Sequence, residues 1–159
     1  MADQVAETAE FDGGVAVGVD GSESSSHALQ RAAIEASCHG WVLHVVRAWS
    51  VRTVPRPSDC PPGAVPTLQE FEKEAQRRTE EFVRAKLGGA KTPFTVEVHV
   101  VHAPPAQALI HASERADLLV VGHRGRGGVA GLLLGSVAED CVRQAHCPVL
   151  VVRPHDQDT

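Results

Sequence analysis

The sequence lacks a hydrophobic run long enough to cross a bilayer, which takes about 20 consecutive apolar residues. Its first residues are acidic and polar, without the apolar segment of a secretory signal peptide. The four cysteines are scattered and form no CxxC pair, which favours small buried side chains in a reducing compartment. We therefore expect a soluble cytoplasmic protein that has no membrane partner.

A face basic enough to bind nucleic acid is also absent. The formal net charge is −5, from 20 Asp and Glu against 15 Lys and Arg. Six of the acidic residues lie in residues 1–12 and 155–159, which contain no Lys or Arg. The other 14 acidic residues nearly balance the 15 basic ones, so residues 13–154 are close to neutral. We expect no nucleic-acid partner.

The chain length suits one folded domain, which at 159 residues would bury about two-thirds of its unfolded surface. Residues 1–12 show no core pattern, and we predict a flexible acidic N-terminal tail there. The predicted domain covers residues 13–154, and residues 155–159 form a short C-terminal tail. No internal repeat is present.

Five short runs rich in valine and leucine alternate with four helical patterns. Continuous apolar runs are typical of strands buried on both faces of a parallel sheet, and the third run alternates enough to be an outer strand. Ser22 or Ser24 would cap the first helix and Gly40 would end it. The predicted strands are residues 14–20, 41–49, 94–101, 117–122 and 148–154, and the other helices are residues 67–87, 106–115 and 135–145.

This alternation implies right-handed βαβ crossovers and therefore a doubly wound α/β domain. Residues 50–66, between the second strand and the second helix, contain five prolines and are predicted to form a surface loop. In such folds ligands bind beyond the carboxyl ends of the strands, where the winding reverses. The turn at Asp20 and the loop at Gly122 both lie at such ends.

Six glycines crowd into residues 120–136, where Gly122, Gly125, Gly135 and Ser136 follow the pattern G-x2-G-x9-G-S. The first two glycines would let backbone N–H groups approach an anion without a Cβ in the way. The last two residues would begin a helix whose free N–H groups and dipole favour phosphate, with Arg124 as a counter-charge. A flexible loop and an ordinary helix cap are the alternative, but the position between a buried strand and a helix favours phosphate binding.

The spaced glycines, the opening VAVGVDGSESSSHAL, the LHVV of the second strand and the ending GSVAEDCVRQAHCPVLVVRP resemble the universal stress protein family. The resemblance extends from about Val15 to Pro154. It implies a Rossmann-like, doubly wound five-stranded parallel sheet with strand order 3-2-1-4-5 and helices on both faces. One subclass of the family binds ATP and one lacks the glycine motif. This chain resembles the ATP-binding subclass because its motif is intact.

The resemblance implies an ATP site, often with a divalent ion such as Mg²⁺ or Mn²⁺. The end of the first strand would contact the ribose or adenine, and the second strand would offer its backbone to the adenine edge. The glycine loop would line the ribose and first phosphates, and the start of the last helix would hold the outer phosphates. In that order the residues are Gly18, Val19 and Asp20; Val45; Val121, Gly122, Arg124 and Gly125; and Gly135, Ser136 and Val137.

Two of these expectations have structural alternatives. Asp20 before Gly-Ser is also a good turn former. The resemblance implies a homodimer through the C-terminal strand from Val149 to Arg153, whereas Pro148, Pro154 and Arg153 could instead protect that sheet edge. His123 and Ala138 depart from the residue types common in the family, which affects the expected contacts in detail.

We identify no catalytic residue. No Ser/His/Asp or paired-carboxylate arrangement can be argued from spacing, and the GGAKT stretch of residues 88–92 lacks the Gly-Lys-Ser/Thr order of a P-loop. We predict a nucleotide-dependent sensor or regulator of the stress response, with an unknown protein partner and at most slow ATP hydrolysis. The alternatives are a slow ATPase or kinase-like enzyme, binding of AMP or cyclic AMP, and a nucleotide-independent scaffold.

The histidines suggest no metal site. His99 and His102 lie three residues apart on an alternating strand, so their side chains would point to opposite faces. We predict that His44 is a hydrogen-bonded core residue and that His123 is exposed in its loop.

Overall fold

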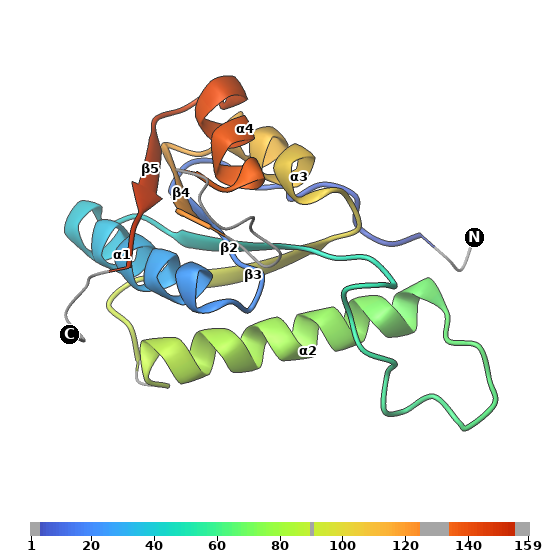
Figure 1. Ribbon diagram of the computed structural model, residues 1–159. Helices are drawn as coiled ribbons and strands as arrows, with labels where there is room; N and C mark the ends of the chain where they lie inside the picture. Colours follow the sequence, from blue (N-terminus) through green and yellow to red (C-terminus); the bar gives the residue numbers. More distant parts are fainter. Residues whose placement is uncertain (1–3, 90, 125–133, 155–159) are drawn as a thin grey trace.

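The computed structural model describes residues 4–89, 91–124 and 134–154, and Figure 1 shows a central sheet with helices on both faces. All five strands are parallel, in the order β3-β2-β1-β4-β5. This confirms the predicted doubly wound fold and its strand order. The strands are β1 Val15–Gly18, β2 Leu43–Ala48, β3 Val96–Val101, β4 Leu118–Gly122 and β5 Val149–Val152.

The helices begin and end within two residues of the predicted positions. Ser22 caps the first helix, because its side chain accepts the Ser25 N–H at 3.2 Å, and Gly40 ends it in the left-handed conformation at φ 67°. The second helix begins with a capping box between Thr67 and Glu70. The helices are α1 Glu23–His39, α2 Leu68–Leu87, α3 Pro105–Ser113 and α4 Ser136–Gln144.

The core lies on both sides of the sheet. On the face covered by α1 and α2, alternate strand residues such as Val17, Val45 and Val120 pack with Leu29. On the face covered by α3 and α4, the intervening residues, among them Leu119, pack with the helices. Burial on both faces explains why the strands read as continuous apolar runs. None of the described helices is long and apolar enough to span a membrane.

Residues 4–12, for which a flexible tail was predicted, pack against the sheet. Ala9 is buried, and the ring of Phe11 stacks on His44 with centroids 3.9 Å apart. The Ala6 carbonyl accepts the His102 N–H at 2.7 Å. These contacts are made with strands far along the chain, so no local pattern in the first twelve residues could reveal them. Residues 1–3 and 155–159 lie outside the described residues.

Candidate functional site

A cavity of about 470 Å³ lies at the carboxyl ends of β1, β2 and β4; we call it the strand-end cavity. This is the position where the winding of the sheet reverses, as expected for a ligand site in this kind of fold. Its volume falls within the range of about 300–1,000 Å³ that is typical of small-molecule sites. Nine of the eleven predicted residues line it: Gly18, Val19, Asp20, Val121, Gly122, Arg124, Gly135, Ser136 and Val137.

The structure does not bring Val45 to the strand-end cavity. Its side chain is fully buried on the opposite face of the sheet, against α1 and α2. The next residue, Val46, lines the cavity, and its carbonyl accepts the Val19 N–H at 3.1 Å. Successive side chains of a strand point to opposite faces, so the side chain of Val46 reaches the cavity and that of Val45 does not. Gly125 lies outside the described residues.

The N-terminus of α4 forms one wall of the strand-end cavity. Gly135 is its N-cap residue and donates its N–H to the His123 carbonyl at 2.8 Å, which holds α4 beside the end of β4. No side chain caps this end of the helix within the described part of the chain. The first N–H groups of a helix have no acceptor within the helix, and the dipole makes this end positive. This wall therefore suits an anionic group.

Three arginines and one carboxylate line the same cavity. Arg47 comes from the end of β2, Arg52 from the loop that follows, and Arg124 from the residues after β4; Asp20 is the carboxylate. Arg124 and Asp20 were predicted from the sequence, whereas Arg47 and Arg52 were not. Their position at the carboxyl end of β2 was the available signal, because ligand-binding residues gather at that edge.

Asp20 has the turn-forming role that its sequence context suggests. Its Oδ1 accepts the Ser22 N–H at 2.9 Å, which fixes the turn between β1 and α1. The same residue lines the strand-end cavity. The turn-forming and ligand-facing interpretations are therefore compatible at this position.

Two glycines of the cavity are also required by packing. A Cβ on Gly122 would lie 2.6 Å from Ser24 Oγ and 3.0 Å from Ser24 O, where α1 crosses the end of β4. A Cβ on Gly18 would lie 2.6 Å from Cδ1 of Leu109 in α3. Neither glycine has a positive φ. The close approach of helices to strands therefore explains both glycines before any ligand is considered.

His123 is partly buried rather than exposed, which corrects its prediction. Its Nε2 is buried, with no hydrogen-bond partner among the described residues, and its backbone N–H donates to the Val152 carbonyl at 2.8 Å. It does not line the strand-end cavity. The residue therefore joins β4 to β5 through its backbone.

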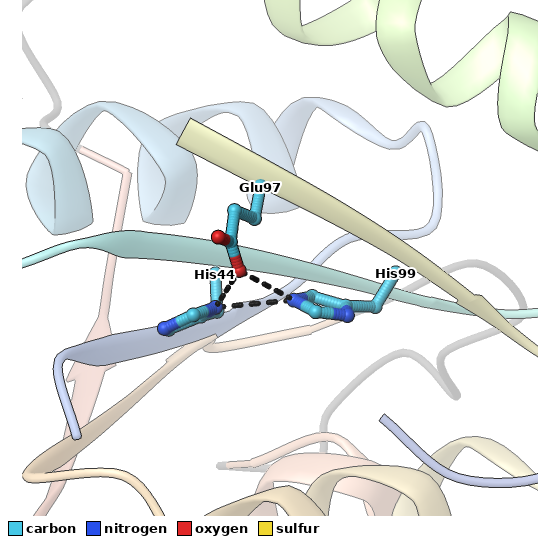
Figure 2. Close-up of side chains that lie close together, drawn as sticks. All are labelled: His44, Glu97 and His99. Atoms are coloured by element: carbon cyan, nitrogen blue, oxygen red, sulfur yellow. Dashed lines mark hydrogen bonds and ion pairs between the residues drawn. The ribbon is translucent and has the colours of Figure 1, made fainter. Parts of the chain in front are cut away.

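A second group of polar side chains lies between β2 and β3; we call His44, Glu97 and His99 the His–Glu cluster (Figure 2). His44 Nδ1 lies 3.1 Å from His99 Nε2 and 3.2 Å from Glu97 Oε2. Burial lowers the pKa of both imidazoles, and for His44 the neighbouring His99 lowers the pKa further. The sequence predicted a buried His44 but not the cluster, because His44 meets Glu97 and His99 only through the pairing of β2 with β3.

The profile of the universal stress protein family matches residues 14–153. The chain belongs to the universal stress protein family. Among relatives, a universal stress protein of Mycobacterium tuberculosis is 38% identical over 142 residues, which are 87% of this chain and 44% of that protein. The chain thus spans less than half the length of that relative. This membership confirms the resemblance that the glycine spacing and the flanking strands suggested.

Two further universal stress proteins match most of their own length. One from Thermus aquaticus is 36% identical over 136 residues, which cover 84% of this chain and 93% of that protein. A solved structure of a universal stress protein in complex with cAMP has a TM-score of 0.62 and 28% identity. The match covers 92% of this chain and the whole chain of the cAMP complex. Both relatives therefore match this chain over most of its length.

Proposed function

We propose that the strand-end cavity binds an adenine nucleotide, with ATP as the expected ligand. The observation that carries this proposal is the meeting of an uncapped helix N-terminus, at Gly135 and Ser136, with Arg52 and Arg124 around one cavity. Backbone N–H groups and guanidinium groups are the donors that bind phosphate in proteins. The residues present therefore fit a polyphosphate.

The rest of the cavity fits a nucleoside. Apolar groups from β2 and α3 line it, among them Val46, Ala48 and Leu109, and they suit the faces of a planar base. Asp20 offers carboxylate oxygens that can accept hydrogen bonds from ribose hydroxyls. In this arrangement the base lies toward α3 and the phosphates toward α4. Mg²⁺ or Mn²⁺ would supply extra positive charge to the phosphates, and the Ser136 hydroxyl is the nearby oxygen ligand we propose for it.

The relative solved with cAMP supports an adenine nucleotide as the ligand class. It also keeps AMP and cyclic AMP as alternatives to ATP. The number of phosphates decides between them: ATP uses both the α4 N-terminus and the arginines, whereas a monophosphate uses one set of donors. Affinities for the whole nucleotide series therefore distinguish the three.

We propose regulation rather than catalysis as the role of this binding. Asp20 is the lining carboxylate, its Oδ1 is engaged by the Ser22 N–H, and no histidine lines the cavity among the described residues. A phosphoryl-transfer enzyme needs a group that positions or activates the nucleophile. We therefore expect ATP hydrolysis to be slow at most. Occupancy of the cavity would set the surface offered to a partner protein in the cytoplasm.

We also propose that β5 pairs with β5 of a second copy to form a homodimer. The carbonyls of Pro148 and Val152 accept N–H groups of Leu119 and His123, so these β5 residues face β4. The alternate residues Val149 and Val151 direct their backbone groups outward at the sheet edge. A Val151→Pro substitution would remove an outward N–H and should convert a dimer to a monomer in analytical ultracentrifugation. A wild-type chain that sediments as a monomer would contradict this assembly.

Calorimetric titration of nucleotide-stripped protein tests the proposed ligand. ATP, ADP, AMP and cyclic AMP are titrated with and without Mg²⁺ into the wild type and into Arg52→Gln and Ser136→Ala. Loss of a charged hydrogen bond to phosphate costs about 1.5–3 kcal/mol, so Arg52→Gln should weaken ATP binding about 10-fold to 100-fold. Ser136→Ala should weaken it about five-fold, because it removes one neutral hydroxyl.

Arg143→Gln is the matched control, since Arg143 is an exposed residue in the last turn of α4 and lies outside the strand-end cavity. Its ATP affinity should equal that of the wild type. Absence of heat for every nucleotide would overturn the proposed ligand and leave a nucleotide-independent scaffold. Catalytic turnover of ATP at several per second would overturn the regulatory role in favour of an enzyme.

A further inference from the structure

The His–Glu cluster is separate from the strand-end cavity. None of its three residues lines that cavity. His44 lies near the start of β2 and pairs directly with Glu97 of β3, and His99 lies two residues further on, on the same face of β3 (Figure 2). This is the face that carries α3, α4 and the N-terminal residues, and Phe11 stacks on His44 there.

The three ligand atoms of the cluster form a compact triangle. Its edges are 3.1 Å between His44 Nδ1 and His99 Nε2, 3.2 Å between His44 Nδ1 and Glu97 Oε2, and 3.7 Å between His99 Nε2 and Glu97 Oε2. In a tetrahedral zinc site with bonds of 2.0–2.1 Å, neighbouring ligand atoms are separated by about 3.3 Å. One ion can therefore contact all three atoms with little movement of the side chains.

All three atoms can direct a lone pair toward the centre of the triangle. The carboxylate of Glu97 does so when it is ionised, and each imidazole does so when its proton is on the other ring nitrogen. A cation at the centre accepts a lone pair from each of the three atoms at once.

The ligand types select the class of ion. Two imidazoles and one carboxylate suit Zn²⁺ and neighbouring first-row transition metals, whereas Mg²⁺ and Ca²⁺ prefer oxygen ligands. The Glu97 side chain is 50% exposed and the His44 side chain is 4% exposed. His44 is therefore a buried ligand, and an ion can reach the cluster from solvent on the side of Glu97. The exposed side leaves room for water as a fourth ligand.

We propose that His44, Glu97 and His99 form a site for Zn²⁺ or a similar divalent transition metal. The ion joins the edge strand β3 to β2, and through the ring of His44 it supports the packing of Phe11. It stabilises this edge of the sheet and takes no part in nucleotide binding.

Metal titration of the full chain tests this site. Chelator-treated protein is titrated calorimetrically with Zn²⁺, and Co²⁺ is used in parallel because its visible absorption reports coordination geometry. We expect one ion per chain and the intense absorption of tetrahedral Co²⁺. Removing one of three ligands should weaken binding at least 10-fold, so Glu97→Gln and His99→Gln should both show this loss. Zn²⁺ at 100 times its dissociation constant should raise the Tm of the wild type by about 5–10 °C.

Two control variants separate this site from other zinc-binding groups. His146→Gln removes an exposed histidine and Cys38→Ser removes an exposed thiol, and both should bind Zn²⁺ as the wild type does. Thermal unfolding of the metal-free variants shows whether Glu97→Gln and His99→Gln fold. No binding by the wild type would overturn the site. Full retention of binding in Glu97→Gln and His99→Gln, with loss in either control, would overturn it as well.

Discussion

Gly122 ends β4 beneath the first turn of α1, and its replacement by alanine tests what this glycine is for. The added Cβ would lie 2.6 Å from Ser24 Oγ, 3.0 Å from Ser24 O and 3.1 Å from Ser24 C. All three separations are shorter than the 3.5–4.0 Å of ordinary carbon contacts. Ser24 Oγ can rotate away, but the backbone of Ser24 cannot. The substitution should therefore push α1 away from the strand.

The cost of this substitution follows from two opposing effects. Overpacking of a close contact costs about 1–3 kcal/mol. Alanine also restricts the unfolded chain, which offsets about 0.4–1 kcal/mol because Gly122 has an ordinary negative φ. We expect a net loss of about 1–2 kcal/mol in the free energy of unfolding. For a domain of this size the Tm should fall by about 2–8 °C.

A double-mutant cycle with Ser24→Ala is the assay, with urea unfolding of the wild type, both single variants and the double variant. Ser24→Ala removes the closest contact and the hydrogen bond that Ser24 Oγ accepts from the Arg124 N–H at 3.3 Å. In that background Gly122→Ala should cost at least about 0.5 kcal/mol less. Unchanged stability of Gly122→Ala together with lost ATP binding would refute the packing argument and assign the glycine to ligand approach.

Three further predictions concern caps, charges and thiols. Thr67→Ala should lower the free energy of unfolding by about 1 kcal/mol and the Tm by about 2–4 °C in calorimetry, because Thr67 Oγ1 caps α2 by accepting the Glu70 N–H at 3.2 Å. Hydrogen bonds from Arg77 and Arg78 lower the pKa of buried Glu74. The ionised carboxylate therefore stabilises the fold at pH values above its unfolded pKa, and this stabilisation is lost as the pH falls through the folded pKa. Glu74→Gln should therefore cost about 1 kcal/mol in urea unfolding at neutral pH and nothing at strongly acidic pH. Burial raises the pKa of Cys141 to about 11, so iodoacetamide at pH 8 should modify exposed Cys38 and leave Cys141 intact, as read by mass spectrometry.

The secondary structure could be predicted well because its signals are local. The run from Val15 to Gly18 is apolar throughout because neighbouring strands and both helical layers bury it. Ser22 and Thr67 mark helix starts through side-chain hydrogen bonds to residues three positions later. The strand order could not be obtained from such local patterns. It came from the family resemblance and is confirmed by the pairing of β1 with β2 and β4.

The sequence predicted half of the residues that line the strand-end cavity and did not predict two of its arginines. The motif located Gly122, Gly135 and Ser136, but Arg47 and Arg52 lie outside any motif and reach the strand-end cavity only because β2 ends there. Val45 was expected to offer its backbone to the adenine edge, and the strand-end cavity is lined by its neighbour Val46 instead. Which residues reach the cavity here depends on the register of β2 and on the path of the loop that follows it.

The amino-acid sequence by itself determined the family, the succession of strands and helices along the chain, the helix caps and the glycine motif. Each of these is visible in short stretches of neighbouring residues. Only the tertiary structure decided which distant residues meet. It placed Phe11 on His44, joined His44 to Glu97 and His99 across two strands, and set Ser24 against Gly122. Such contacts depend on the register and packing of elements tens of residues apart, and no local pattern records them.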